Sequence, residues 1–385
     1  MREDISIYIH IPFCKKKCYY CDFVSFDNKE DMIEKYINAL CEEILKNAEI
    51  LCEYNIKSIY FGGGTPSFIP SKYIVQIMDT LKLFISDDIT KKEITIEVNP
   101  NSATFEKLSN YYSAGINRIS IGLQTTHDKI LKNIGRSHTF VDFKNTLKAA
   151  NDIGFRNISL DLIYPLPGLH LNMFKDSLQT ILNLKNEYNI KHISVYNLEI
   201  HPNTRLEFLL KEKFMSLCSE DEEYEMRTLL NDTLEKNGFT KYEISNYAKE
   251  GFKSKHNLCY WNQDKYLGFG VNSSSFFNGK RYQNTKSLDE YISFMSNDKD
   301  LVIYSEELDK LALMKEYAIL RLRLKEGINL VEFKKKFNTN FFDIFNDEIS
   351  SLQKDNLVFI NKQNNSISLT KRGEEVANIV WEIFI

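Results

Sequence analysis

At 385 residues, with 43% hydrophobic and 26% charged side chains, the chain has an ordinary globular composition and is long enough for one large domain plus a smaller one. A formal net charge of -4 gives no electrostatic reason to bind nucleic acid or an anionic membrane. The first residues carry both signs of charge, and no apolar run reaches the roughly 18 residues of a spanning helix, so we expect a cytoplasmic protein without a signal peptide.

The first 200 or so residues alternate between short β-branched runs and longer amphipathic ones, which is typical of βα repeats. We expect strands at Ile5–Ile11, Lys57–Phe61, Glu93–Val98, Arg118–Gln124, Asn157–Tyr164 and His192–Ile200. We expect helices at Asp31–Leu45, Lys72–Ile85, Phe105–Ala114, Phe140–Ile153 and Met173–Leu184. Six such repeats predict an α/β fold whose parallel sheet curls into a partial (β/α)6 barrel. In a barrel the site lies at the C-terminal ends of the strands.

The alternation stops after about residue 203, so we expect a barrel at 1–215, an extension at 216–300 and a small C-terminal domain at 301–385. In the last part, a helical pattern precedes two short strands and a final helix. Its expected elements are the helices Glu307–Leu324, Leu330–Phe337 and Phe341–Gln353 and the strands Leu357–Asn361 and Ser366–Leu369. Helices followed by a hairpin favour a winged-helix-like fold, here without the basic residues that would indicate nucleic acid.

Three of the seven cysteines lie close together, directly after the first strand. Cys14, Cys18 and Cys21 have the spacing CxxxCxxC, and in a cytosolic chain such clustering favours metal over disulfides. Three thiolates can hold three irons of a 4Fe-4S cluster, and since no fourth cysteine follows, one iron would stay open to a small molecule. A structural zinc site is the alternative, but zinc would prefer a second CxxC or a histidine pair.

The segment around these cysteines, from Tyr8-Ile-His-Ile-Pro-Phe-Cys14 to Cys21-Asp-Phe, resembles the radical SAM superfamily. It is similar to the branch that holds oxygen-independent coproporphyrinogen III oxidase and the haem chaperones called HemW, and the resemblance covers nearly the whole chain. It implies a radical SAM barrel that holds a 4Fe-4S cluster and S-adenosylmethionine (SAM). It also implies an electron donor of the flavodoxin or ferredoxin type.

A glycine run, Gly62-Gly63-Gly64-Thr65-Pro66, follows the second strand and allows close approach of the backbone to a ligand. Alone it is often only a tight turn, but behind the cysteine loop it resembles the family's site for the methionine end of SAM. Carboxylates can accept ribose hydroxyls and an arginine can pair with a carboxylate, although each could also be a surface group at a strand end. By resemblance, the SAM pocket would be lined by Tyr8, Tyr20, Gly63, Gly64, Thr65, Glu97, Gln124, Arg136 and Asp161. No catalytic residue is expected apart from the cluster and SAM site.

Farther along the chain, His256-Asn-Leu-Cys259-Tyr260-Trp261 matches the HNxxYW motif of the haem chaperones. A histidine can be an axial haem ligand, and aromatic side chains offer flat apolar surface to a porphyrin. By resemblance, the haem candidates are therefore His256, Cys259, Tyr260 and Trp261. Two alternatives remain: the histidine could be hydrogen-bonded within an aromatic core, or the thiolate could be the iron ligand instead.

Two features separate the branches of the family. The oxidase has a further cysteine two residues after its third cluster ligand, where this chain has Phe23, and it is longer. A stretch that usually reads Gly-Ala-His-Ser is Asn272-Ser-Ser-Ser275 here, which removes one candidate ligand. The resemblance implies a haem chaperone that passes haem to an acceptor protein, through which it could contact a membrane peripherally. The alternative is a coproporphyrinogen III oxidase or another SAM-dependent enzyme that acts on a tetrapyrrole.

Overall fold

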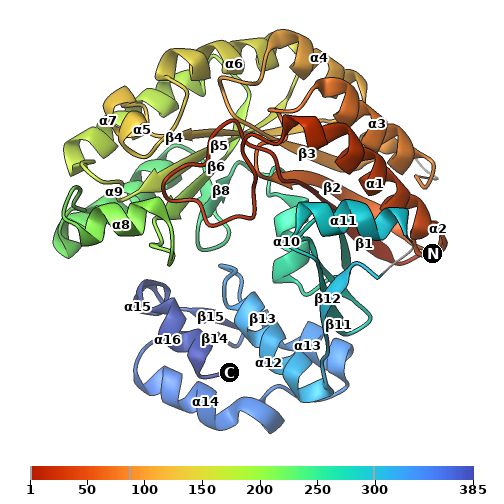
Figure 1. Cartoon of the computed structure of the whole chain (residues 1–385). Helices are drawn as coiled ribbons and strands as arrows, with labels where there is room; N and C mark the ends of the chain where they lie inside the picture. Colours follow the sequence, from red (N-terminus) through yellow and green to blue (C-terminus); the bar gives the residue numbers. More distant parts are fainter. Residues whose placement is uncertain (1, 86–87, 298–299) are drawn as a thin grey trace.

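The computed structural model describes residues 2–85, 88–297 and 300–385. Its largest element is a 12-stranded sheet with the order β12-β11-β10-β9-β1-β2-β3-β4-β5-β6-β8-β7. The centre of this sheet consists of six parallel strands, and helices cover its outer face in an arc (Figure 1). The expected α/β fold with a mostly parallel sheet is confirmed.

The central strands are β1 (Asp4–Ile11), β2 (Asn55–Gly63), β3 (Glu93–Val98), β4 (Arg118–Gln124), β5 (Asn157–Tyr164) and β6 (Ile190–Asn197). The helices between them are α1 (Ile33–Lys46), α2 (Ala48–Glu53), α3 (Ser71–Lys82), α4 (Phe105–Ser113), α5 (Asp128–Asn133), α6 (Phe140–Ile153) and α7 (Leu171–Leu184), with single 3-10 turns at Glu30–Met32 and Ile89–Lys91. The sixth strand ends at Asn197, not at Ile200 as expected. The last hydrogen bond to β5 runs from the Leu198 N–H to the Tyr164 carbonyl at 2.7 Å, and no pairing continues beyond it in the described residues.

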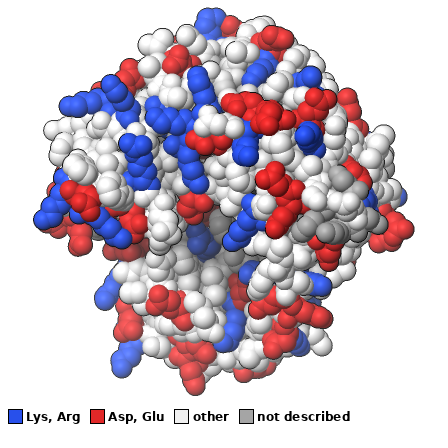
Figure 2. All heavy atoms as spheres, viewed as in Figure 1, with Lys and Arg blue, Asp and Glu red and all other residues white. Residues whose placement is uncertain are grey.

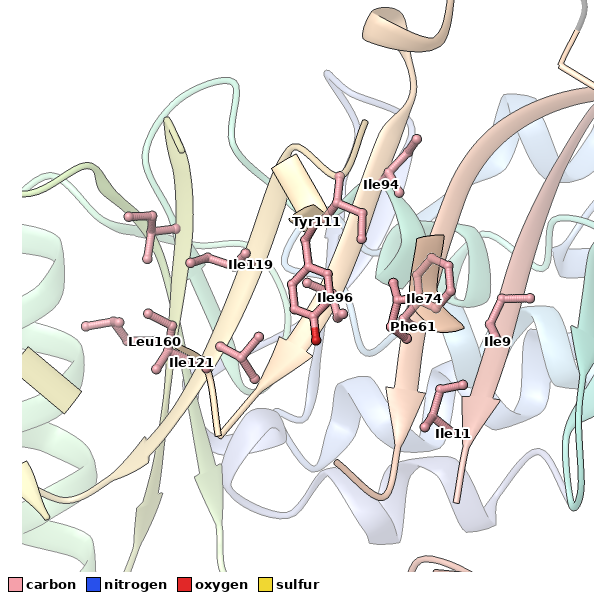
Figure 3. Close-up of a cluster of buried hydrophobic side chains, with 14 of the residues drawn as sticks. Ile9, Ile11, Phe61, Ile74, Ile94, Ile96, Tyr111, Ile119, Ile121 and Leu160 are labelled. Carbon is pink, nitrogen blue, oxygen red and sulfur yellow. The ribbon is translucent and has the colours of Figure 1, made fainter. Parts of the chain in front are cut away.

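Side chains along each central strand alternate between an apolar outer face and a polar inner face, since successive residues point to opposite sides of a sheet. On β3, Ile94 and Ile96 lie on the outer face with Ile74 of α3 and Tyr111 of α4 (Figure 3). Thr95 therefore points the other way, into the concave side. Parallel strands buried on both faces usually read as continuous apolar runs. The polar inner face thus indicates that the concave side holds a ligand.

The expected extension joins the same sheet. Its strand β8 (Asn246–Ala248) pairs antiparallel with β6, and β9 (Tyr266–Phe269) pairs parallel with β1. The other elements here are α9 (Glu220–Lys236), β7 (Thr240–Lys241), α10 (Lys255–Trp261), β10 (Ser274–Phe277), β11 (Lys280–Asn284) and α11 (Leu288–Ser296). Just outside the expected bounds lie α8 (Arg205–Lys211) before the extension and β12 (Val302–Glu307) after it. Sequence analysis missed these strands because they are too short for a recognisable alternation. The three-part division of the chain stays a prediction.

A second hydrophobic core lies in the C-terminal part, between Met314 and Phe384. There a three-stranded antiparallel sheet with the order β13-β15-β14 packs with helices. The elements are α12 (Lys310–Arg321), β13 (Ile328–Asn329), α13 (Leu330–Phe337), α14 (Phe342–Lys354), β14 (Val358–Asn361), β15 (Ser366–Leu369), α15 (Lys371–Glu375) and α16 (Ala377–Glu382). Within the described ranges, no helix combines the length and the apolar character needed to cross a bilayer.

Two expectations for this part were wrong in detail. The helix expected from Glu307 begins at Lys310, because β12 pairs with β11 up to Glu307 and the Asp309 side chain then caps the helix at the N–H of Ala312. The final helix is two short helices, since Val376 between them has φ -122° and ψ 34°.

A buried carboxylate, Glu43 on α1, ties the first helix to the far edge of the sheet. It accepts hydrogen bonds from the Gly270 N–H at 2.8 Å, from the Asn284 amide at 2.6 Å and from the Tyr291 hydroxyl. Burial raises its pKa to about 7, although these three donors oppose the shift. The folded state therefore holds a proton here that the unfolded chain releases near its ordinary pKa of 4.5.

Replacing Glu43 with glutamine should remove this proton linkage. In the wild type the group lowers the free energy of unfolding as pH rises from 4.5 to about 7, by up to about 1.4 kcal/mol per pH unit, and has no further effect above. Glu43→Gln should therefore gain stability relative to the wild type across that window. Urea unfolding at a series of pH values measures the difference. Glu97, whose pKa is also raised to about 7, titrates in both proteins. Its contribution therefore cancels in the difference between their free energies of unfolding. A difference that does not vary with pH would contradict the argument.

Candidate functional site

A cavity of about 1160 Å³ occupies the concave side of the sheet and continues to the C-terminal domain. Figure 2 shows the molecule hollowed between these two parts. Its walls are the C-terminal ends of the central strands, the loop that follows β1, and residues 371–381 of the C-terminal domain. Pockets for one drug-sized ligand measure roughly 300–1000 Å³, so this cavity has room for more than one small molecule.

The cysteine loop crosses the open side of the sheet after β1 (Figure 1), and backbone hydrogen bonds hold it there. Cys14 donates its N–H to the Phe26 carbonyl at 3.0 Å, and Tyr19 donates to the Ile134 carbonyl at 3.0 Å. The Arg205 guanidinium lies 4.3 Å from the centre of the Tyr19 ring. Cys14, Cys18 and Cys21 are free thiols that line the cavity. The structure thus brings together the three predicted metal ligands.

The thiols fit a cluster better than a single ion. In the described parts of the chain, no three histidine, cysteine or acidic side chains converge closely enough to share one metal ion. Thiolates that each hold a different iron of a 4Fe-4S cluster need no such convergence. Burial raises the pKa of Cys21 to about 11, so binding of iron would displace its proton. Arg136 donates to Cys18 Sγ at 3.7 Å and so places positive charge beside the thiols.

The glycine run forms a cradle against the end of β1. Gly63 has φ +106°, and a Cβ there would lie 2.5 Å from the His10 ring. A Cβ on Gly64 would lie 2.9 Å from the Ile11 carbonyl oxygen. Next in the chain, the Thr65 hydroxyl is 3.4 Å from Cys14 Sγ. Because Gly63 and Gly64 have no side chains, their backbone can lie close to the cysteine loop. A backbone exposed in this way can hold a ligand through its main-chain groups.

Two carboxylates reach the cavity from the inner face of the sheet. Glu97 accepts a hydrogen bond from the Tyr60 hydroxyl at 2.8 Å, and burial raises its pKa to about 7. The Ser120 hydroxyl lies 3.0 Å from both oxygens of Asp161, whose pKa burial also raises. Either carboxylate can accept hydroxyl groups of a ribose.

An unsatisfied acceptor lies between them. Gln124, at the end of β4, has the left-handed φ of +69°, and its Oε1 is buried without a hydrogen-bond partner. Arg136 donates to the nearby Gly122 carbonyl at 2.7 Å. A buried orphan acceptor costs about 1–3 kcal/mol unless a ligand satisfies it, so this position fits a ligand donor.

The two tyrosines predicted for the SAM pocket lie differently. Tyr20 lines the cavity, and burial raises its pKa. Tyr8 is half-buried on the inner face of β1 but does not line the cavity, and its hydroxyl bonds to His10 Nδ1 at 3.0 Å. His10 in turn bonds through Nε2 to the Val24 carbonyl at 3.0 Å. Tyr8 therefore supports the cysteine loop through His10.

The HNxxYW segment forms α10 and divides between the wall and the interior. His256 is buried with Nδ1 3.0 Å from Ser58 and Nε2 2.8 Å from the Tyr260 hydroxyl. Burial lowers its pKa to about 3, so the ring is neutral. Cys259 is also buried, and burial raises its pKa to about 12. As haem ligands, His256 and Cys259 stay predictions that this conformation does not favour, because neither lines the cavity.

Tyr260 and Trp261, in contrast, line the cavity, as does Asn257. Sequence analysis missed the residues that reach it from elsewhere in the chain. Ser120 could have been found as a polar residue in an apolar strand run. The signal for the C-terminal wall is weaker, since only the aromatic character of Trp381 marks it. Among the lining residues that sequence analysis missed are Ser120, Arg323 and Trp381.

Comparison with known proteins finds relatives along nearly the whole chain. The chain matches the radical SAM superfamily over residues 8–181 and the HemN C-terminal domain over residues 308–374. It is 34% identical over 385 residues to a protein named heme chaperone HemW from Lactococcus lactis subsp. lactis, covering 100% of this chain and 98% of that relative. It is 33% identical over 380 residues to the protein of the same name from Bacillus subtilis, covering 99% of each.

Among solved structures, coproporphyrinogen III oxidase (HemN) from Escherichia coli, described as a radical SAM enzyme, superimposes with a TM-score of 0.84. The match covers 100% of this chain and 90% of that chain at 22% sequence identity, which shows a shared fold.

Proposed function

The chain belongs to the haem chaperone HemW branch of the radical SAM superfamily, and from this premise we propose that it binds haem and delivers it to acceptor proteins. The observation that carries the proposal is that one cavity is lined both by the cluster cysteines and by Trp261 of the HNxxYW segment. At about 1160 Å³ it exceeds what SAM alone would need. A flat tetrapyrrole is a suitable second occupant, since aromatic side chains offer it apolar surface.

We propose that Cys14, Cys18 and Cys21 hold a 4Fe-4S cluster and that the glycine cradle with Glu97 and Asp161 holds SAM. Such a cluster supplies, when reduced, one electron for the cleavage of SAM. The role of the chain is to position and shield. Glu97 and Asp161 can accept hydroxyl hydrogens, Gln124 Oε1 offers an unsatisfied acceptor, and Arg136 neutralises negative charge beside Cys18.

Two partners follow from this proposal. A chaperone requires an acceptor for its haem, and contact with a membrane would come through that acceptor. Reduction of the cluster requires a one-electron donor of the flavodoxin or ferredoxin type. Lys15, Lys16 and Lys17 are exposed on the cysteine loop and would attract an acidic donor.

Haem titration of the anaerobically purified full-length chain tests the function. We expect a bound Soret band at about one haem per chain, and no conversion of coproporphyrinogen III in the presence of SAM and reductant. Trp261→Ala should weaken haem binding at least about tenfold through lost aromatic contact. Steady conversion of coproporphyrinogen III would instead identify an oxidase.

The same titration decides the role of His256. Because its two ring nitrogens already bond to Ser58 and Tyr260, His256→Ala should leave the position of the Soret band unchanged. A shifted band in this variant, with an unchanged band in Cys259→Ser, would make the histidine the iron ligand. The reverse result would assign the iron to the thiolate.

A further inference from the structure

Both tryptophans of the chain stack on one arginine at the junction of the sheet and the C-terminal domain. The Arg323 guanidinium lies 4.6 Å from the centre of the Trp261 ring and 4.4 Å from that of Trp381. The three residues come from α10, from the turn after α12, and from α16. All three line the cavity that contains the cluster cysteines.

Three nitrogen atoms of this Trp–Arg–Trp stack lack hydrogen-bond partners among the described residues. Arg323 Nε and both indole Nε1 atoms are buried without a hydrogen-bond acceptor. Among the residues that the structure describes, Arg323 forms no ion pair. The neighbouring cations do, since Lys241 and Lys325 both bind Glu374, at 2.8 Å and 2.7 Å. Glu243 is buried nearby and attracts Arg323 only through space.

This geometry is suited to one kind of ligand group. Two indole rings stacked on one guanidinium restrain its plane and leave its edge for hydrogen bonding. An edge with parallel N–H groups matches a carboxylate, which it binds with two hydrogen bonds. Burial lowers the pKa of Arg323, because the cation has lost solvent that an anion could replace.

We propose that Arg323, stacked on Trp261 and on Trp381, binds a propionate carboxylate of the tetrapyrrole at the C-terminal end of the cavity. The inference rests on the proposed haem function and adds an anion-binding residue, Arg323, outside the HNxxYW segment. It explains why the C-terminal domain closes the cavity, since Arg323 and Trp381 both belong to that domain. Haem would be selected by its acidic edge as well as by its flat surface.

Comparison of haem with its dimethyl ester, which lacks the carboxylates, tests this assignment in the full-length chain. The wild type should bind haem about 10- to 100-fold more tightly than the ester, as expected for charge-assisted hydrogen bonds. Arg323→Met keeps an apolar chain between the indoles but removes the charge, and should reduce that preference at least about tenfold. Arg323→Lys, which keeps the charge without the planar edge, should lie between. Arg372→Met is the matched control, because Arg372 is exposed in the same domain and does not line the cavity.

Each outcome separates this site from the proposed function. If the wild type binds neither haem nor the ester, the haem function itself is wrong. If it binds both equally, or if Arg323→Met keeps the wild-type preference, haem binding stands and the carboxylate site is wrong. Circular dichroism and iron content show whether each variant folds. If Arg323→Met does not fold, the carboxylate site is still tested by two measurements. These are the preference of the wild type for haem over its dimethyl ester and the same preference in Arg323→Lys.

Discussion

Serine at Cys14, Cys18 or Cys21 is expected to abolish the iron–sulfur cluster. Reconstituted without oxygen, the wild type should carry about four iron and four sulfide per chain. Each of the three thiols lines the cavity on one short loop, and no other cysteine lines it among the described residues. Loss of one ligand would leave two, too few to hold the cluster. Iron and sulfide analysis and the absorption spectrum measure the loss directly.

Serine at Cys41 or Cys52 provides the control. Cys41 is buried on α1 and Cys52 is exposed on α2, and neither lines the cavity. Both variants should keep the full iron and sulfide content. Anaerobically isolated wild type that contains zinc and no sulfide would refute the cluster assignment.

Alanine at Gly63 should have the second largest effect, a loss of SAM binding of about a hundredfold or more. Its φ of +106° is unfavourable for any residue with a Cβ, and that Cβ would lie 2.5 Å from the His10 ring. Strain and overpacking together cost about 2–6 kcal/mol. His10 cannot move without cost, because its ring bonds to Tyr8 and to the Val24 carbonyl of the cysteine loop.

Gly251→Ala is the matched control for this substitution. Gly251 also has a positive φ, +80°, but a Cβ there would meet nothing within 4 Å. It should therefore cost only the backbone strain, about 1–2 kcal/mol of stability, and leave SAM binding unchanged. The effect of SAM on the paramagnetic resonance spectrum of the reduced cluster reports binding, while iron content is measured separately. Wild-type SAM affinity in Gly63→Ala would show that the cradle does not hold the ligand.

Much of the fold could be predicted because its information is local. The outer faces of β3 and β4 repeat isoleucine at every second residue, and this period alone predicts strands. The same alternation left Thr95 and Glu97 on the inner face, which predicts a polar interior. Short strands such as β8 and β9 could not be predicted, since their pairing with β6 and β1 depends on chain segments far away.

The sequence by itself also predicts the metal end of the proposed site. Cys14, Cys18 and Cys21 lie on one loop, so their spacing defines the proposed ligand set whatever the rest of the chain does. The glycine run is similar, because it follows directly from β2. Local spacing is sufficient to predict a site when its residues belong to one segment of the chain.

Only the tertiary structure decided the other end of the cavity, near α10 and the C-terminal domain. It packed His256 between Ser58 and Tyr260, where burial keeps the ring neutral and both nitrogens bonded. It also stacked Arg323 on two tryptophans that are 120 positions apart in the sequence. Such contacts depend on how the C-terminal domain returns to the sheet, and no local period or spacing encodes that return. The physical reason is that burial and stacking are properties of packed surfaces, which exist only once distant segments meet.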